Sequence, residues 1–166
     1  MNLYTAYYHS PVGVLKLQCS DKYIKTVTYS DVEGEIQNDE HKLLQSCTKQ
    51  LDEYFAGKRK HFTLPLNQDG TEFQEKIWTL LSKIPYGKTI SYNELAKQYG
   101  DNKAIRAAAS ANGKNNICII VPCHRVIGSD HSLVGYAGGL WRKKWLLDHE
   151  AKYELGVQEL FPVSAS

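Results

Sequence analysis

The segment SYNELAKQYGDNKAIRAAASANG, residues 91–113, decides the fold of the second half of the chain. Ser91 followed by Glu94 is a capping box, and Gly100 is a favourable helix end, so the pattern predicts one short helix. After the turn GDN, an alanine-rich stretch predicts a second helix that ends at Gly113. Two short helices joined by a tight turn indicate a helix-turn-helix.

The second of these helices has an unusual surface. It offers long polar side chains only near its start, at Lys103 and Arg106, and small side chains follow from Ala107 onward. Small residues reach little toward base edges, so this face favours contact with phosphates and DNA shape, and it also fits the minor groove. Packing of the alanines against a neighbouring helix or sheet explains the same pattern. Periodicity leaves both interpretations open.

Segments on either side of residues 91–113 extend the predicted domain. TEFQEKIWTLLSKIP (71–85) has helical spacing and a capping box of Thr71 with Gln74. ICIIVP (117–122) is a buried strand candidate, and GSDHSLVGYAGG (128–139) is a glycine-rich loop or wing. LWRKKWLLDHE (140–150) predicts a last amphipathic helix.

The first third of the chain has a different pattern. GVLKLQCS (13–20) and YIKTVTYS (23–30) alternate apolar and polar residues with DK between them, which predicts an antiparallel hairpin. Residues 41–57 have the spacing of a helix that ends at a glycine. A polar, turn-rich stretch follows, so we place a domain boundary near residue 70. The predicted domains are 1–70 and 71–166.

Length and composition are those of a soluble globular protein. The 166 residues allow one ordinary domain or two small ones, and the net charge of +2 means that any nucleic-acid surface must be local. The start MNLYTAYYHS does not resemble a signal peptide, and the longest apolar run, ICIIV, is strand-sized. We therefore expect a cytoplasmic protein, without membrane contact, whose four cysteines are reduced.

Within VPCHRVIG (121–128), Cys123 is a candidate nucleophile. A cysteine attacks as a thiolate and needs a base. The adjacent His124 could reach the sulfur through one bridging water, and Asp148 or Glu150 could hold its other nitrogen. A cysteine, a histidine and a carboxylate are the residue types of a hydrolase catalytic triad.

Three other interpretations of this segment remain open from residue types alone. Cys123 could be a small buried residue. Cys118, Cys123 and His124 could bind a metal, although their spacing matches no usual zinc pattern, so we expect no metal. Pro122 and Arg125 could serve only to shape a turn.

The string PCHRVIG, followed by GYAGGLWRKKWLLDHE and preceded in order by ISY, IRA and AN, resembles the O6-alkylguanine-DNA alkyltransferase family. The resemblance covers residues 71–150 strongly and the N-terminal third in general layout. It implies an α/β ribonuclease-H-like domain over residues 1–70. It further implies an α-rich C-terminal domain over residues 71–166 that is winged-helix-like and contains the helix-turn-helix.

The resemblance also implies a DNA-repair activity. Such proteins bind double-stranded DNA containing O6-alkylguanine through a helix-turn-helix in the minor groove, flip the damaged nucleotide out, and move its alkyl group onto a cysteine. O4-alkylthymine is a second candidate substrate. The thioether is permanent, so each molecule acts once, as a monomer and without a cofactor. The departure NNIC, where the family usually has Asn-Pro and a further proline, places Cys118 near the site.

Residue roles follow from the same resemblance. Cys123 corresponds to the acceptor, His124 to a base acting through water, Glu150 to the carboxylate that orients it, Tyr92 to the donor toward the leaving guanine, and Asn115 to the residue that braces the nearby turn. Arg106 corresponds to the arginine that replaces the flipped base, and Ala107, Ser91 and Arg125 to further DNA contacts. Tyr136, Val126 and the backbone N–H of Ala137 correspond to the substrate pocket.

Two other functions stand beside this one. The chain could be a non-catalytic helix-turn-helix regulator or lesion-binding protein in which Cys123 is merely buried. It could also be a cysteine hydrolase, which would turn over a small ester rather than keep a methyl group.

Overall fold

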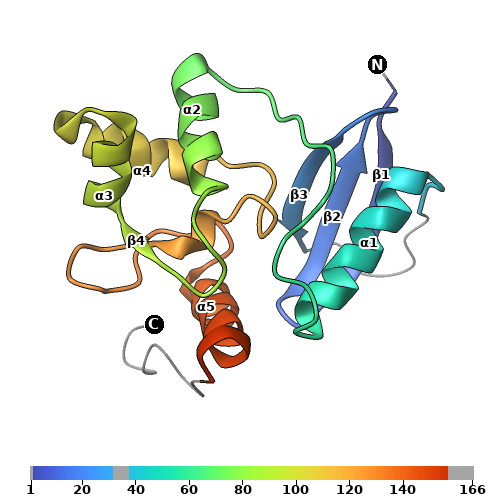
Figure 1. The fold of residues 1–166 in the computed structure, drawn as a ribbon. Helices are drawn as coiled ribbons and strands as arrows, with labels where there is room; N and C mark the ends of the chain where they lie inside the picture. The colour runs from blue at the N-terminus through green and yellow to red at the C-terminus, as the bar shows by residue number, and fades with distance from the viewer. Residues whose placement is uncertain (1, 32–37, 157–166) are drawn as a thin grey trace. The chain divides into compact units, whose positions relative to one another are not determined.

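The computed structural model describes residues 2–31 and 38–156, and these divide into two units (Figure 1). The first unit contains the chain up to Asp69 together with Asn116–Ile120, and the second contains the remainder. The change from the first unit to the second at residues 69–70 lies next to the boundary predicted near residue 70. Residues 116–120, which follow that boundary in the sequence, cluster with the first unit.

Three antiparallel strands form the sheet of the first unit. In the order β1-β2-β3 they span Tyr4–Ser10, Gly13–Cys19 and Ile24–Ser30. The register pairs Ala6 with Leu17, and Leu17 in turn with Val27. The hairpin predicted between residues 13 and 30 is therefore confirmed, whereas β1 lies outside the predicted segments.

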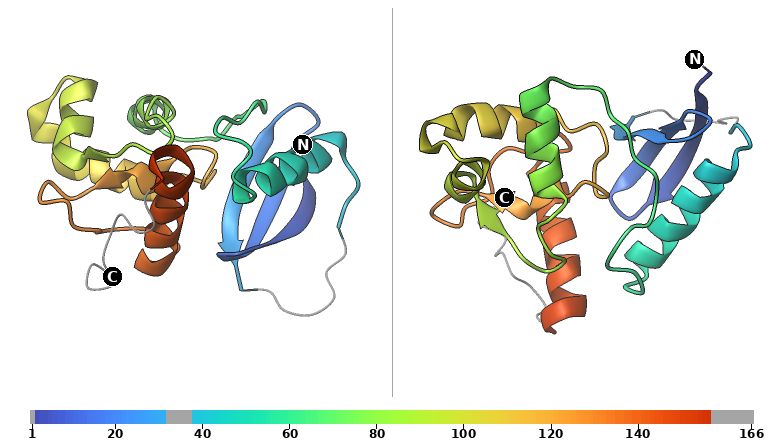
Figure 2. Two further views of the ribbon diagram at one scale, coloured as in Figure 1. Left: turned by 60° about the horizontal axis from the view of Figure 1, so that its bottom comes forward. Right: turned by 45° about the horizontal axis from the view of Figure 1, so that its top comes forward.

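The helix α1 (Lys42–Phe55) packs against β1 and β2, and both views in Figure 2 show it beside the sheet. Its apolar residues recur with helical spacing, and they are buried, as are alternate residues of β2. The buried positions are Leu15, Leu17 and Cys19 on β2 and Leu44, Cys47, Leu51 and Tyr54 on α1. The alternation on β2 and the 3.6-residue period on α1 place these apolar side chains in one core of the first unit. The helix predicted over residues 41–57 is confirmed.

Residues 117–122 are buried but do not form the predicted strand. The N–H of Val27 donates to the carbonyl oxygen of Asn116 at 2.8 Å, and the N–H of Cys118 donates to the carbonyl oxygen of Val27 at 2.9 Å, which makes a single bridge to β3. The chain then leaves the extended conformation at Ile119, whose φ is +73°. The predicted strand over residues 117–122 is therefore wrong. The sequence could not reveal this, because a buried turn and a buried strand have the same apolar content.

The second unit carries the predicted helix-turn-helix. Both capping boxes, Thr71 with Gln74 and Ser91 with Glu94, are present, and the first helix of the pair ends at Gly100 with φ +105°. The helices are α2 (Glu72–Leu81), α3 (Tyr92–Tyr99), the short η1 (Asn102–Ala104) and α4 (Ile105–Gly113). Contacts among α2, α3 and α4 form a helical cluster. The predicted helices are confirmed.

A parallel strand pair connects this cluster to the cysteine segment. β4 (Ile90–Ser91) pairs with β5 (Val126–Ile127), which follows the one-turn helix η2 (Cys123–Arg125). Residues 128–139 form a loop closed near its start, where the N–H of Gly128 donates to the carbonyl oxygen of Ser132 at 2.9 Å. The last helix, α5 (Leu140–Leu155), confirms the prediction for residues 140–150.

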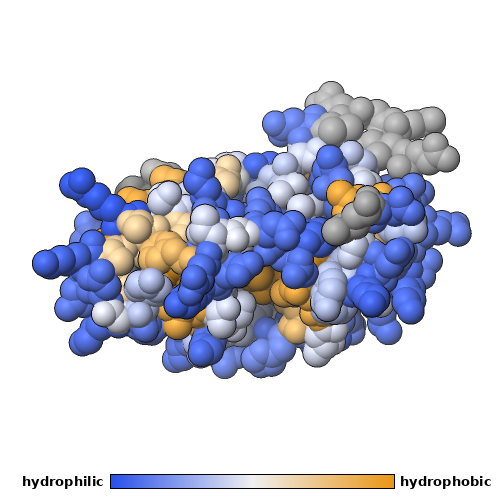
Figure 3. Space-filling model, turned by 90° about the horizontal axis from the view of Figure 1, so that it is seen from above, coloured by the Kyte–Doolittle hydropathy of each residue, from blue (hydrophilic) through white to orange (hydrophobic). Residues whose placement is uncertain are grey.

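Hydrophilic residues predominate on the face shown in Figure 3, with smaller apolar patches between them. No helix within the described residues is long and apolar enough to cross a membrane. All four cysteines lie in the described part of the chain, and none forms a disulfide. The described residues also contain no group of three or more histidine, cysteine or acidic side chains placed to hold a metal ion.

Candidate active site

Two tight backbone features set the position of Cys123. Its N–H donates to the carbonyl oxygen of Val121 at 2.8 Å across Pro122, whose φ of −81° and ψ of 65° are those of an inverse γ-turn. The η2 turn begins at Cys123 itself, and only 5% of this residue is exposed. The thiol is thus held in a rigid turn that is almost fully buried.

Two asparagines from the end of the helix-turn-helix brace this turn. Asn115 Nδ2 donates to the carbonyl oxygen of Val121 at 2.8 Å, which is the position expected for a bracing residue. Asn112 Nδ2 donates to the carbonyl oxygen of Cys123 at 3.3 Å, and this contact was not predicted. Both asparagines are buried. The end of α4 is therefore bonded directly to the backbone that carries the thiol.

His124 and Glu150 form a buried hydrogen-bonded pair. His124 Nε2 lies 2.7 Å from Glu150 Oε2, and both side chains are fully buried. Because a carboxylate only accepts hydrogen bonds, Nε2 carries the proton and donates to it. This tautomer leaves the lone pair of Nδ1 as an acceptor. Among the described residues, no protein group bonds Nδ1.

Arg125 is an ion-pair partner of Glu150, which corrects its predicted role as a DNA contact. Its Nε donates to Glu150 Oε1 at 2.8 Å and its Nη2 to Oε2 at 3.0 Å. Nη1 donates to the carbonyl oxygen of Ile84 at 2.7 Å, and the residue is only 6% exposed. All the nitrogens of the guanidinium are occupied inside the protein. Arg125 therefore stabilises the carboxylate that holds His124.

The pKa values of the pair follow from this arrangement. Burial lowers the pKa of His124 below its ordinary value of 6.5, outweighing the opposing attraction of Glu150. Burial alone would raise the pKa of Glu150, but His124 and Arg125 together hold it below its ordinary value of 4.5. At neutral pH the site thus contains a neutral imidazole and an ionised carboxylate, the combination that a base needs.

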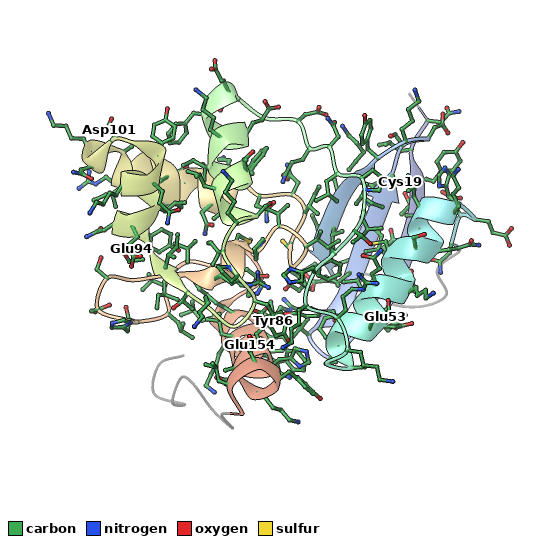
Figure 4. All side chains as sticks on the ribbon, viewed as in Figure 1. Cys19, Glu53, Tyr86, Glu94, Asp101 and Glu154 are labelled. Carbon is green, nitrogen blue, oxygen red and sulfur yellow. The ribbon has the colours of Figure 1, made fainter. Side chains whose placement is uncertain are left out.

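A turn that contains Gly87 contacts Glu150 of the His124–Glu150 pair. Gly87, with φ +77°, lies in the turn after α2, and its N–H points toward Glu150 Oε1 at 3.5 Å. A Cβ at this position would lie 2.7 Å from side-chain carbons of Glu154. Tyr86 of the same turn and Glu154 of α5 lie near one another in Figure 4. Glycine is therefore required here both by conformation and by space.

Tyr92 lies at the start of α3, and its hydroxyl meets the loop of residues 128–139. The hydroxyl donates to the carbonyl oxygens of Val134, at 3.0 Å, and Gly135, at 3.4 Å. Burial raises the pKa of Tyr92, a thiolate at Cys123 raises it further, and a hydrogen bond with Asn112 opposes both. The hydroxyl therefore keeps its proton at neutral pH and can donate it.

Lys143 belongs to the same cluster and was missed in the sequence. Its side chain is fully buried, and its Nζ donates to the two carbonyl oxygens that Tyr92 also contacts, at 2.8 Å and 3.3 Å. The signal was present: Lys143, Leu147 and Glu150 are spaced i, i+4 and i+7, so the lysine shares the buried face of α5. A cation on such a face predicts a functional or structural partner.

The remaining predicted residues fall into exposed and buried groups. Arg106 and Ala107 are exposed on α4, and Ser91 is half-buried, with its side chain accepting from the N–H of Glu94. Tyr136 is half-buried and Ala137 is exposed in the loop of residues 128–139. Val126 is fully buried within β5 and pairs with Ile90.

A separate surface cavity of about 600 Å³ lies between α2 and α3. Its lining residues are Glu72, Glu75, Lys76, Thr79, Leu80, Gln98, Tyr99 and Gly100. None of these is a member of the cysteine cluster, and none is a nucleophile with a neighbouring base. This cavity is not the candidate active site.

The protonation states of the buried pair predict how stability depends on pH. Below 6.5 the unfolded chain protonates His124 while the folded protein resists, and below 4.5 the same holds for Glu150. Because the unfolded state then binds more protons, the free energy of unfolding falls with acidification, by at most about 1.4 kcal/mol per pH unit for each group. Urea unfolding on both sides of pH 6.5 measures this. His124→Gln is expected to flatten the slope, and an unchanged slope in that variant would contradict the assignment.

Fold and site together define a two-unit protein whose helix-turn-helix unit carries a buried cysteine–histidine–glutamate set. Residues 72–152 match the family described as 6-O-methylguanine DNA methyltransferase, DNA binding domain, and residues 3–68 match its ribonuclease-like domain. The chain belongs to the 6-O-methylguanine DNA methyltransferase family. Its N-terminal unit is the ribonuclease-like domain, and its helical C-terminal unit is the DNA-binding domain.

Individual relatives and solved structures agree with this family. The methylated-DNA–protein-cysteine methyltransferase of Methanosarcina acetivorans is 41% identical over 89% of this chain and 98% of its own length. The constitutive enzyme of that name from Bacillus subtilis is 45% identical over 83% and 88%. The crystal structure of Mycobacterium tuberculosis O6-methylguanine methyltransferase matches with a TM-score of 0.83 and 38% identity, covering 92% and 94%. The structure of the M. tuberculosis protein in complex with DNA has a TM-score of 0.82 at the same identity and coverage.

Proposed function

We propose that this protein repairs alkylated duplex DNA by moving the alkyl group from O6 of guanine onto Sγ of Cys123, once per molecule. The observation that carries the proposal is the buried chain of contacts around the thiol. Cys123 is the first residue of η2, and Nε2 of the next residue, His124, lies 2.7 Å from Glu150 Oε2. Nδ1 of His124 is available as an acceptor. The names of relatives at 41% and 45% identity describe the same reaction class for those proteins.

The proposed transfer is a single displacement at an sp3 carbon. The thiol proton passes through a water to Nδ1 of His124, and the thiolate attacks the alkyl carbon. A carbon–sulfur bond forms as the carbon–oxygen bond breaks, and the bonding electrons stay on the guanine. Tyr92 donates a proton to the leaving guanine, and the proton that His124 took from the thiol then passes through solvent to the Tyr92 oxygen. The product thioether is not hydrolysed, and the step needs no cofactor.

The proposed DNA contacts lie on the helix-turn-helix. Arg106 and Ala107 are exposed on α4, where small side chains permit close approach to a groove without reading bases. Damage occurs in any sequence, so binding should depend on backbone and shape. The guanidinium of Arg106 is planar and can take the place of the flipped nucleotide in the base stack. Ser91 at the start of α3 supports the same surface, and Tyr136 and the N–H of Ala137 face the guanine.

We also propose finer features of the protein. The loop of residues 128–139 takes the place of the wing in a winged-helix-like arrangement, because it follows β5 directly. The protein acts as a monomer in the cytoplasm. O4-alkylthymine is accepted as a second substrate, since it presents an alkyl carbon on an exocyclic oxygen in the same way.

A labelled-methyl experiment separates this function from its alternatives. Duplex DNA carrying O6-methylguanine with a labelled methyl group is incubated with the protein. One equivalent of label per protein molecule, reached without further turnover, supports the proposal. Tight binding to the damaged duplex without transfer would instead identify a lesion-binding regulator. Repeated cleavage of a small ester would identify a hydrolase.

Arg106→Ala is expected to slow transfer from duplex DNA by about tenfold or more, because flipping costs a few kcal/mol that a wedge residue partly offsets. Transfer from the free base O6-methylguanine needs no flipping and should be unchanged. Lys103→Ala, which removes a nearby exposed cation, is the control and should weaken only salt-sensitive binding. Equal losses on duplex and free base would rule out the wedge role.

A further inference from the structure

The side chain of Asn112, near the end of α4, has no assigned part in the reaction proposed above. It is 3% exposed, and its Nδ2 donates to the carbonyl oxygen of Cys123 at 3.3 Å. The opposite amide orientation would place Oδ1 against that carbonyl oxygen, and two acceptors cannot form a hydrogen bond. The contact with Cys123 therefore fixes the orientation of the amide and leaves Oδ1 for another partner.

Oδ1 of Asn112 is a buried acceptor that the protein itself does not satisfy. Within residues 2–31 and 38–156, no protein group donates a hydrogen bond to it. Native proteins satisfy nearly all buried polar groups, and an ordered water commonly does so where a side chain does not. Nδ1 of His124 is a second buried acceptor that no described protein group bonds.

These two acceptors flank the peptide group that joins Cys123 to His124. Asn112 bonds the carbonyl oxygen of that group, and the His124 side chain leaves the α-carbon that follows it. Because Nε2 is directed at Glu150, 2.7 Å away, Nδ1 is the ring nitrogen on the side of the His124 backbone. The Cys123 thiol leaves the α-carbon that precedes the same peptide group. A water bonded to the thiol, Nδ1 and Oδ1 would have three partners, the usual number for a buried water.

We propose that Asn112 is a positioning residue whose Oδ1 holds the water that carries the thiol proton to His124. This inference rests on the proposed function, in which a water is the proton carrier. The neutral thiol donates to the water, which donates one hydrogen to Nδ1 and the other to Oδ1. As Nδ1 takes a proton from the water, the water takes the thiol proton and stays neutral. It then donates to the thiolate, and its bond to Oδ1 is kept throughout.

An acceptor at this place orients the water. Since Oδ1 only accepts, it takes one hydrogen of the water, so the other hydrogen is directed to Nδ1 and a lone pair is left for the thiol. A donor at the same place would compete with the thiol for that lone pair. Asn112 also braces the Cys123 backbone through Nδ2, so one side chain positions both the nucleophile and the water.

A high-resolution crystal structure of the protein without DNA tests the water directly. The expected result is an ordered water within hydrogen-bond distance of both Asn112 Oδ1 and His124 Nδ1, next to Sγ of Cys123. A water that bonds Nδ1 but not Oδ1, or no ordered water at either atom, would overturn the proposal. Because this test involves no damaged DNA, a failure of methyl transfer to Cys123 would be recognised separately.

Thiol reactivity tests the consequence in solution. In Asn112→Leu, which keeps the size of the side chain without an acceptor, iodoacetamide modification of Cys123 should slow about fivefold at neutral pH, the effect of losing one hydrogen bond. Its pH profile should move to higher pH, whereas a merely loosened turn would change the rate alike at every pH. Asn116→Leu, at an exposed position, is the matched control and should keep the wild-type profile. A wild-type profile in folded Asn112→Leu would overturn the proposal, and the crystal structure decides if that variant does not fold.

Discussion

Glu150→Gln is expected to destabilise the folded protein by about 3 to 5 kcal/mol, which is the usual cost of removing one partner from a buried ion pair. The glutamine has nearly the shape of glutamate, but it leaves the guanidinium of Arg125 buried without its counter-charge. Its amide nitrogen cannot accept a hydrogen bond, so a donor of either His124 or Arg125 loses its acceptor. Urea unfolding followed by circular dichroism measures the loss.

Glu53→Gln is the matched control for this prediction. Glu53 also accepts a hydrogen bond from an arginine Nε, that of Arg59, at 3.1 Å, but its side chain is 34% exposed. A partly exposed pair of this kind contributes about 0 to 1 kcal/mol. If Glu150→Gln cost no more than Glu53→Gln, the buried pair would not be the support of the site that the structure indicates.

Tyr92→Phe is expected to slow methyl transfer by about a hundredfold or more while DNA affinity is largely kept, because positioned proton donors contribute on this scale. The variant loses only the hydroxyl, which in the unbound protein donates to the carbonyl oxygen of Val134 at 3.0 Å. Single-turnover kinetics with saturating O6-methylguanine duplex give the transfer rate, and a binding titration gives the affinity.

Tyr99→Phe controls for the loss of a tyrosine hydroxyl from the same helix. Tyr99 packs edge-on against Phe73 and lines the separate cavity between α2 and α3. Its replacement should change neither rate nor affinity. A Tyr92→Phe protein that bound DNA weakly but transferred at the wild-type rate once bound would contradict leaving-group assistance.

Local signals in the sequence predicted most of the helices. The capping boxes at Thr71 and Ser91 depend on residues three positions apart, so each could be recognised without knowledge of the fold. The two-residue period of β2 and β3 was equally local. The turn at Ile119 could not be found in this way, because a run of buried apolar residues has the same composition in a strand and in a turn.

The site residues that belong to a sequence motif could be predicted, whereas side-chain contacts between distant parts of the chain could not. Residue types made Cys123 and His124 candidates with either Asp148 or Glu150, and the family resemblance selected Glu150. The structure brings His124 and Glu150 together. The role of Arg125 in holding Glu150 joins residues 25 positions apart, which no spacing rule reveals. Lys143 was overlooked because a lysine is ordinarily assigned to the exposed face of a helix.

Peptide mass analysis of the cysteines after reaction with O6-methylguanine duplex DNA tests whether Cys123 is the methyl acceptor. One added methyl group is expected on the peptide containing Cys123, with Cys19, Cys47 and Cys118 unmodified. No methyl transfer is expected to a Cys123→Ser protein that remains folded and binds DNA. A methyl group found on another residue, or an unmodified Cys123 in protein that has consumed the lesion, would contradict the assignment of Cys123 as acceptor.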